Sequence, residues 1–571
     1  MTASSRMSRP VTRRPRRVVL CLVLGALLGV AGFPGSGGAA TETPEQVRPA
    51  AVSTPSAVDS LPVVTPAVAC QQLAAMDLAA LTGQPVSIGS AAVTTATPGG
   101  WEACDVRGVI APQEQFQALL PTSTWRQLYL QTGCGGFCGS VNISAPAAVG
   151  CAPLTAGQFV LASDNEGHYG TAAFDATFGA DPELRADFGH RSEHKLAVFI
   201  KQLIKTFYGK PAAYAFYDGC SQGGHEGLTE AQRFPGDFNG IVSGAPASIT
   251  QPLNIWYQAW NALANQGPGG RPVLTADKLV PLHAAALKAC AGSNGLIMDP
   301  LVCRFDPGTI QCAPGATDTA ACLTPQQVQA ARKLYSGPRD DRGRLMYPGW
   351  QLPGSELNWV PWVVPAAPGG FTIDPTIALN TIRYLAYDDI DPRRGLADVP
   401  FTEAGFRKIM AATAGTFDAT DPDLSAFRNA GGKLLLWHGL ADPAISPVGT
   451  VAYYQAVQDR MGGPGPTSAF ARLFLMPGMN HCAGGEGPSS FDALSAVVAW
   501  VVRGTPPASI LTSHADGGNA VQSLPAYPYP LVATYNGSGD VNVASSYHAA
   551  PPQVPFDAHV RWLGEFAPAR R

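Results

Sequence analysis

Residues 213–233 constrain the fold more than any other stretch, because they place a turn of small residues between a strand-like run and a helix-like run. Residues 213–217 are aromatic and apolar, and residues 226–233 are compatible with a helix. Between them, Gly219-Cys-Ser-Gln-Gly matches the pattern Gly-x-Ser-x-Gly. Small residues on both sides of the serine allow a strained turn that lifts its hydroxyl above the end of a strand. The bare pattern is common by chance, so this setting is what makes Ser221 a candidate nucleophile.

Short apolar runs alternate with glycine-rich turns and helical periodicity on both sides of this turn. Residues 127–130 are typical of a strand, and residues 194–207 carry apolar side chains at helical spacing. Such alternation predicts an α/β fold with a mainly parallel sheet and helices on both faces. Residues 250–410 differ, with five of the ten tryptophans and several Pro/Gly breaks. We therefore predict a catalytic domain made of residues 67–249 and 411–571, interrupted by an insertion at 250–410.

The N-terminus has the organisation of a secretory signal peptide. Six arginines and no acid precede an apolar run at residues 18–32, and small residues follow at 35–40. This pattern predicts export with cleavage near Ala40, so residues 1–40 form the signal peptide. A membrane anchor is the weaker interpretation, because the apolar run is short for a bilayer. The proline- and threonine-rich residues 41–66 are interpreted as a linker, and we expect no membrane association of the mature, secreted protein.

Charge and cysteine content narrow the class of function. Removing the signal peptide leaves 32 basic and 42 acidic residues, a net charge of −10, which argues against nucleic-acid binding. One of the twelve cysteines is lost with that segment, and eleven remain. In an exported chain these are expected to form disulfides, and the odd number leaves at least one thiol unpaired within the chain. The sequence does not indicate an oligomeric state.

A serine nucleophile needs a base and an acid that orients the base, here in the order Ser, Asp, His. Asp442 lies in the turn after the apolar run 433–437, and His481 lies in the loop after the run 471–476. A lone aspartate or histidine is usually a surface or loop residue. Three such residues in this order, each just past a predicted strand, predict a catalytic triad with Ser221.

Two cysteines flank the predicted triad. Cys220 immediately precedes the serine, and Cys482 immediately follows the histidine. If Ser221 and His481 are in hydrogen-bond contact, the side chains of their neighbours come within disulfide range. We therefore expect a Cys220–Cys482 bridge that ties the base to the nucleophile across the insertion.

The motifs together resemble the tannase/feruloyl esterase family, whose pattern is Cys-Ser, Asp and His-Cys. The resemblance extends over roughly residues 68–555. It rests on Gly-Cys-Ser-Gln-Gly-Gly at 219–224, His-Gly-Leu-Ala-Asp at 438–442 and Pro-Gly-Met-Asn-His-Cys at 477–482, with supporting stretches at 233–246 and 537–540. It implies an α/β-hydrolase core with a large lid at 250–410, inserted between the nucleophile and acid segments. It also implies secreted ester hydrolysis that requires no organic cofactor.

An oxyanion hole needs two backbone N–H groups aimed at the developing negative charge. One is expected from Gln222, directly after the nucleophile. The other is expected from the glycine-rich residues 131–136, with Thr132 or Gly133 as the donor. The alternative interpretation of this segment is simply a tight turn.

The resemblance also implies disulfides Cys70–Cys104 and Cys312–Cys322. The family's lid usually carries an aspartate-rich calcium loop, but residues 290–303 keep only Asp299. Because Ca²⁺ needs several oxygen ligands, a calcium site here is the less favoured alternative. A Cys290–Cys303 bridge is expected to staple the loop instead.

Three further cysteines allow two interpretations. Cys134, Cys138 and Cys151 fit a zinc site of Cys-x₃-Cys plus a third cysteine, but no fourth ligand lies nearby in sequence. The preferred interpretation is a Cys138–Cys151 bridge, which leaves Cys134 as a thiol near the oxyanion turn.

The expected substrate is a small aromatic ester of feruloyl or galloyl type. The family includes a hydrolase of mono(2-hydroxyethyl) terephthalate that binds the free carboxylate with a lid arginine. Here Arg383 is the one arginine between residues 369 and 386, and Thr376 stands at the expected arginine position. Terephthalate half-esters are therefore an alternative, as is a non-catalytic binding module on a hydrolase scaffold. Metal-assisted hydrolysis is a third possibility, which chelators would abolish.

Overall fold

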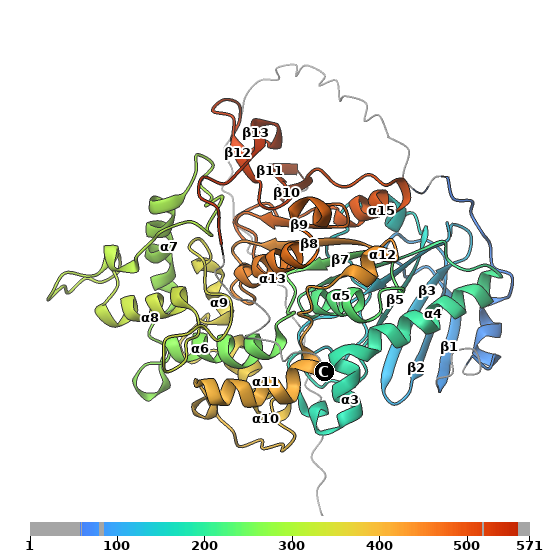
Figure 1. Cartoon of the computed structure of the whole chain (residues 1–571), viewed down its shortest axis with the longest axis horizontal. Coiled ribbons are helices and arrows are strands. Elements are labelled where there is room, and N and C mark those ends of the chain that lie inside the picture. Colours follow the sequence, from blue (N-terminus) through green and yellow to red (C-terminus); the bar gives the residue numbers. More distant parts are fainter. Residues whose placement is uncertain (1–57, 59, 79–84, 517–518, 558–571) are drawn as a thin grey trace, which may run out of the picture. The chain divides into compact units, whose positions relative to one another are not determined.

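A nine-stranded sheet forms the centre of the chain in the computed structural model, which describes residues 58, 60–78, 85–516 and 519–557 (Figure 1). Its strands are β1 (Val86–Thr94), β2 (Ala103–Ile110), β3 (Glu114–Pro121), β4 (Leu128–Thr132), β5 (Phe159–Asp164), β6 (Tyr214–Cys220), β7 (Gly240–Gly244), β8 (Lys433–Gly439) and β9 (Ala471–Met476). The order across the sheet is β1-β2-β3-β5-β4-β6-β7-β8-β9. From β5 to β9 every neighbouring pair is parallel, whereas β1, β2, β3 and β5 pair antiparallel.

Alternation along the central strands explains how the sheet is buried on both faces. Tyr217 and Ile241 belong to one core, together with apolar residues of α4 (Ser192–Tyr208), α5 (Gln222–Arg233) and α13 (Pro447–Arg460). Phe216 and Val242, their neighbours along the same strands, belong to a second core with α15 (Ala493–Arg503). The parallel strands thus need apolar side chains at consecutive positions, which is why they appear in the sequence as continuous apolar runs.

The remaining elements outside the insertion are short helices, the sheet-covering helices and two hairpins. The helices are η1 (Cys70–Ala75), α2 (Ala152–Thr155), η2 (Thr177–Ala180), α3 (Pro182–Ala186), η3 (Asp187–Arg191), α4 (Ser192–Tyr208), α5 (Gln222–Arg233), α13 (Pro447–Arg460), α14 (Pro464–Ser468), α15 (Ala493–Arg503) and η9 (Ala544–Ser546). The hairpin strands are β10 (Ile510–Asp516) with β11 (Asn519–Ala526), and β12 (Val532–Tyr535) with β13 (Tyr547–Ala550).

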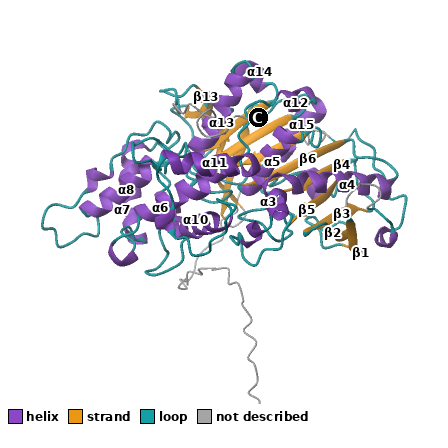
Figure 2. Ribbon diagram, turned by 60° about the horizontal axis from the view of Figure 1, so that its bottom comes forward, coloured by secondary structure: helices purple, strands orange, loops and turns teal. Residues whose placement is uncertain are grey.

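The chain between β7 and β8 is helical and adds no strand to the sheet, all of its residues being described. Its helices are η4 (Pro252–Tyr257), α6 (Gln258–Ala264), η5 (Pro268–Gly270), α7 (Ala276–Cys290), η6 (Pro307–Ile310), α8 (Pro325–Ser336), η7 (Glu356–Asn358), α9 (Trp359–Trp362), α10 (Ile373–Tyr384), η8 (Leu396–Asp398), α11 (Glu403–Phe417) and α12 (Ser425–Asn429). Figure 2 shows α6, α7, α8 and α10 gathered to one side of the strands. The predicted end of the insertion at residue 410 falls inside α11.

The insertion has hydrophobic cores of its own. Trp256 packs with Ile382 and Ile409, and Trp359 packs with Leu279 and Leu334. Both tryptophans are fully buried, so they serve packing rather than ligand contact.

Four of the five expected disulfides are present. Their Cα–Cα distances are 5.5 Å for Cys70–Cys104, 5.9 Å for Cys220–Cys482, 5.8 Å for Cys290–Cys303 and 5.0 Å for Cys312–Cys322. All four lie within the range that disulfide geometry requires.

The predicted Cys138–Cys151 bridge is wrong. Cys138 pairs with Cys134 at a Cα–Cα distance of 5.6 Å, because the turn after β4 folds back on itself. Cys151 is a free, buried thiol before α2, where it accepts a hydrogen bond from Ser495 Oγ at 3.4 Å. Since the bridge consumes the sulfurs of Cys134 and Cys138, neither is available as a thiolate for zinc.

Nothing in the structure bears on the N-terminal predictions. The proposed signal peptide at residues 1–40 and most of the linker at 41–66 lie outside the described residues. Among the helices that are described, none combines the length and apolar character needed to cross a bilayer.

Candidate active site

Ser221 occupies the sharp turn between β6 and α5. Its backbone has φ 67° and ψ −117°, a left-handed conformation that costs energy for a residue with a side chain. Its N–H donates to the carbonyl of Gly244 at 3.0 Å. The flanking glycines are required by space: a Cβ on Gly219 would lie 2.5 Å from the carbonyl oxygen of Gly223, and one on Gly224 would lie 2.2 Å from that of Gly244. The small residues of the motif therefore permit the turn that presents the serine.

His481 and Asp442 meet at the ends of neighbouring parallel strands. Asp442 follows β8 and His481 follows β9, and Nδ1 of the histidine lies 2.7 Å from Oδ2 of the aspartate. The other carboxylate oxygen accepts hydrogen bonds from the N–H groups of Ala444 and Ile445 at 2.8 and 3.0 Å. Burial alone would raise the pKa of Asp442, but the adjacent imidazoles and hydrogen bonds hold it below its usual value. The aspartate is thus an ionised acceptor that orients the imidazole.

His438 completes this arrangement and was not anticipated from the sequence. Its Nε2 lies 3.1 Å from Oδ2 of Asp442 and 2.9 Å from the carbonyl of Ile445. Both neighbours are acceptors, so Nε2 carries the proton and Nδ1 accepts from Thr450 Oγ1 at 2.8 Å. The side chain is fully buried. The spacing of four residues between His438 and Asp442 was the signal available in the sequence.

Ser221 and His481 line one cavity of about 270 Å³. Its walls come from the oxyanion turn (residues 133–138), the segments after β7 and β8, and the helical insertion. The lining residues are Gly135, Gly136, Phe137, Phe174, Cys220, Ser221, Gln222, Ala247, Leu253, Asn254, Gln258, Trp362, Ile377, Ala444, Ile445, His481 and Cys482. Among these described residues there is no lysine, arginine, aspartate or glutamate. The cavity is therefore suited to an uncharged, largely apolar group.

The insertion contributes an aromatic side chain directly beside the histidine. The ring of Trp362 meets the ring of His481 edge-on, with centroids 5.4 Å apart. On the other side, Asn254 and Gln258 add polar groups, and Gln258 Nε2 donates to the carbonyl of Ala444 at 2.9 Å. Arg383, the one arginine between residues 369 and 386, does not line the cavity, and its Nε donates to the carbonyl of Arg394 at 2.8 Å.

The predicted oxyanion donor from the turn after β4 needs correction. The N–H of Gly133 is already bonded to the carbonyl of Asp218 at 3.1 Å, because the ladder between β4 and β6 continues one residue past the strand. Thr132 is the buried last residue of β4 and does not line the cavity. Gly135 and Gly136 of the same turn do line it, as does Gln222, the first residue of α5.

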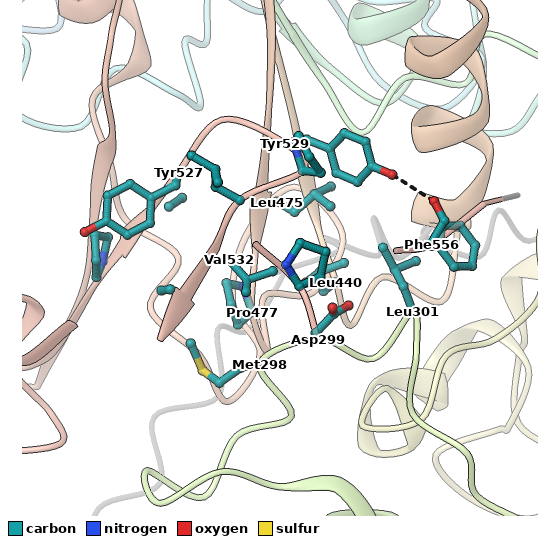
Figure 3. A pocket seen from close by; sticks show the side chains of 16 residues that line it. Met298, Asp299, Leu301, Leu440, Leu475, Pro477, Tyr527, Tyr529, Val532 and Phe556 are labelled. Atoms are coloured by element: carbon teal, nitrogen blue, oxygen red, sulfur yellow. Dashed lines mark hydrogen bonds between the residues drawn. The ribbon is translucent and has the colours of Figure 1, made fainter. Parts of the chain in front are cut away.

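Asp299, the candidate calcium ligand, lies at a second and separate cavity (Figure 3). Figure 3 shows its carboxylate among apolar side chains, including Leu301, Leu440 and Val532. Burial raises the pKa of Asp299. A calcium site needs six to eight oxygen ligands, and among the described residues that line this cavity Asp299 brings the sole carboxylate. The surroundings of Asp299 do not fit calcium.

Comparison with known proteins gives consistent matches. A family model for tannase and feruloyl esterase matches residues 93–550. The mono(2-hydroxyethyl) terephthalate hydrolase of Piscinibacter sakaiensis is 32% identical over 529 residues, covering 79% of this chain and 85% of that protein. A probable feruloyl esterase of Arthroderma benhamiae is 31% identical over 481 residues, covering 75% and 80%. A crystal structure of an esterase from Aspergillus oryzae matches with a TM-score of 0.73 at 27% identity, covering 84% of this chain and 100% of that one.

These matches extend from the first strands of the sheet, through the helical insertion, to the last hairpin. They confirm the resemblance that three short motifs indicated, and the likeness to a solved esterase confirms the α/β-hydrolase fold. The chain belongs to the tannase and feruloyl esterase family and is a carboxylic ester hydrolase.

Proposed function

We propose that this protein is a secreted serine esterase that hydrolyses uncharged aromatic carboxylic esters of feruloyl or galloyl type. The observation that carries the proposal is a single uncharged cavity that holds Ser221 and His481, with Asp442 bonded to the histidine. Its apolar walls suit an aromatic acyl group, and its polar side chains suit the hydroxyl or methoxy groups that such acids carry.

In the proposed mechanism each member of the triad has one task. Nδ1–H of His481 donates to Asp442, so Nε2 is free to accept the proton of Ser221 as Oγ attacks the ester carbonyl. The imidazolium then gives this proton to the leaving alcohol. In the second half of the reaction His481 takes a proton from water as the water attacks the acyl-enzyme. The proton then returns to Ser221 and the acid is released. No organic cofactor takes part in these steps.

The negative charge on the carbonyl oxygen needs two amide donors. We assign one to Gln222 N–H, at the N-terminus of α5. The other is Gly135 or Gly136 N–H, from the oxyanion turn that lines the cavity. The N-terminus of a helix carries partial positive charge, which further favours an oxyanion at this position.

Terephthalate half-esters are the second candidate, because one relative is named as a mono(2-hydroxyethyl) terephthalate hydrolase. Such a substrate has a free carboxylate, which a buried site must pair with a cation or strong donors. The described lining residues include no lysine or arginine. Thr376, at the expected arginine position, donates its hydroxyl to the carbonyl of Thr372 at 3.1 Å. This absence favours the uncharged aromatic esters.

Secretion is part of the proposal. The five disulfides support it, because structural disulfides persist in oxidising compartments. The arginine-rich, apolar start of the sequence supports it independently. Sequencing the N-terminus of the exported protein tests it, and we expect the mature chain to begin close after Ala40.

One substrate panel tests the proposed activity. It compares methyl ferulate, methyl gallate, a terephthalate half-ester and a short p-nitrophenyl ester, each with the wild type and with Ser221→Ala. We expect the highest kcat/KM for one of the two phenolic esters, and loss of turnover in Ser221→Ala. Dominant activity on the half-ester would overturn the substrate assignment.

Labelling with a fluorophosphonate separates an enzyme from a binding module on the same scaffold. The wild type should be labelled at Ser221, and Ser221→Ala should not. Folded wild-type protein that is neither labelled nor active on any ester would refute the serine mechanism. Turnover that survives a chelator excludes metal-assisted hydrolysis.

A further inference from the structure

The two walls of the proposed oxyanion hole are joined through the backbone of one residue, Cys134. Its carbonyl oxygen accepts a hydrogen bond from Gly223 N–H at 2.8 Å, and its N–H donates to Oε2 of Glu226 at 3.3 Å. Gly223 and Glu226 both belong to α5, whose first residue is Gln222. The oxyanion turn is therefore held against α5 at both polar groups of a single residue.

Glu226 is buried at the contact between the oxyanion turn and α5. Its side chain is 2% exposed, and Tyr217 Oη donates to the same Oε2 at 2.5 Å. A Cβ on Gly133 would lie 2.1 Å from Tyr217 Oη, 2.4 Å from this Oε2 and 2.6 Å from Cα of Gly223. The contact is therefore so close that the turn can adopt its position only with glycine there.

A second buried carboxyl group holds the other wall. Nε2 of Gln222 donates to Oε1 of Glu166 at 2.8 Å. Glu166 follows β5 with a left-handed φ of 54°, and its N–H donates to Oδ1 of Asp164 at 2.9 Å. The side chain of Gln222, which supplies one proposed oxyanion amide, is thus bonded to Glu166, and the backbone of Glu166 is held in turn by Asp164.

We propose that Glu226 and Glu166 are positioning residues for the oxyanion hole. Glu226 sets the separation of the oxyanion turn from α5, and Glu166 fixes Gln222. Neither glutamate lines the cavity, so both act through the backbone groups that do. The inference rests on the proposed function, because it requires an oxyanion to form beside Ser221.

The surroundings of the pair favour uncharged carboxyl groups. Burial raises the pKa of Glu226 to about 7, and burial, followed by repulsion from Glu226 whenever that group is ionised, raises the pKa of Glu166. The titratable and charged groups that face the pair, or line the small cavity beside it, are Asp164, Asp187, His190, Arg191, Glu193, Tyr217 and His225. A neutral amide is consequently a close mimic of either side chain, whereas an apolar residue removes the acceptor.

The test compares Glu226→Leu with Glu226→Gln in the full chain, on the best ester of the panel. Leucine removes the acceptor for Cys134 N–H. We expect kcat to fall by about tenfold with KM within about twofold of wild type, because the loss falls on the transition state. Glutamine keeps a carbonyl oxygen at this position and should restore most of kcat. Glu166→Leu and Glu166→Gln should behave in the same way.

Gly133→Ala changes the contact between the oxyanion turn and Glu226 from the side of the turn. It provides a second test if a glutamate variant fails to fold. Its methyl group pushes the turn away from Glu226 and from Tyr217, which donates to Glu226, without removing any polar atom. We expect the same selective loss of kcat.

Glu230 provides the matched control. It is also on α5 and 1% exposed, and its charged neighbours are Asp237, Lys201 and, with the smallest effect, Glu226. Glu230→Leu should change the melting temperature and leave kcat unchanged. Wild-type kcat in folded Glu226→Leu and Gly133→Ala would overturn the inference, as would equal losses in the leucine and glutamine variants. A wild type without esterase activity or fluorophosphonate labelling would instead refute the proposed function, and the inference with it.

Discussion

His438 shows how one buried side chain can control the acid of the triad. It bridges Asp442 and Thr450, and it is fully buried. In His438→Leu the carboxylate loses one of the groups that hold its direction, and Thr450 loses its acceptor. We expect kcat to fall by about tenfold and the free energy of unfolding to fall by about 1–3 kcal/mol. Steady-state kinetics and urea unfolding measure the two effects, and an unchanged kcat would contradict the orienting role.

Trp362 is the residue on which aromatic selectivity is expected to depend. It comes from α9 of the insertion, and its ring lies beside that of His481. Trp362→Ala removes a flat apolar wall, so kcat/KM for a phenolic ester should fall by about tenfold or more. A short p-nitrophenyl ester carries no aromatic acyl group, so we expect its kcat/KM to fall by less than about threefold. Equal losses on both substrates would mean that Trp362 supports the site rather than selects the acyl group.

Sequence alone predicted Ser221, Asp442 and His481 as a triad, because each follows a strand that is visible as an apolar run. The structure bonds His481 to Asp442 and places Ser221 and His481 at one cavity. The oxyanion donors were harder to place. The sequence does not show which N–H groups of a glycine-rich turn are already bonded within the sheet. In the structure the N–H of Gly133 is bonded to the carbonyl of Asp218 and is therefore not free to bind an oxyanion. His438 lies inside β8 and resembles an ordinary core residue without its partners.

At the scale of elements, predicted strands match the structure where both faces are buried. The run 471–476 is β9, and the run 433–437 is the first part of β8. Helix α5 begins at Gln222, four residues before its predicted start. The glycines in its first turn have low helix propensity, so the sequence shows no sign of a helix there. Close packing against the neighbouring strand and turn is what favours glycine at these positions. The antiparallel strands β1 and β2 had no comparable signal, since polar and small residues interrupt their apolar positions.

The Cys134–Cys138 bridge belongs to this scale, because it closes the turn that carries the proposed donors. The bridge spans four residues, whereas Cys220–Cys482 spans 262. Stabilisation by loop closure grows with the length of the loop. The double variant Cys134→Ser/Cys138→Ser should therefore lower kcat with little change in melting temperature, and Cys220→Ser/Cys482→Ser should lower both. Calorimetry with kinetics on the two variants distinguishes these outcomes, and a large loss of stability in the first would contradict a local role.

At the scale of the whole molecule, one histidine joins the insertion to the loop that bears the base. His283, on α7, has Nδ1 2.7 Å from Glu356 of the insertion and Nε2 2.7 Å from Glu486. Glu486 follows His481 by five residues in the same loop. Tyr335 donates to the other oxygen of Glu356 at 2.6 Å. The insertion that covers the site and the loop that carries the base are thus linked through a charged imidazole.

This link predicts a loss of stability at alkaline pH. Burial alone would lower the pKa of His283, but Glu356 and Glu486 raise it to about 9. A raised folded-state pKa stabilises the fold fully below the unfolded value of about 6.5, and the stabilisation disappears as pH rises through about 9. The melting temperature of the wild type should therefore exceed that of His283→Gln at neutral pH, and the two should converge above pH 9. Because 43% of the Glu486 side chain is exposed, added salt should narrow the gap at neutral pH. Parallel melting curves across this pH range would show that the imidazole is not charged in the folded protein.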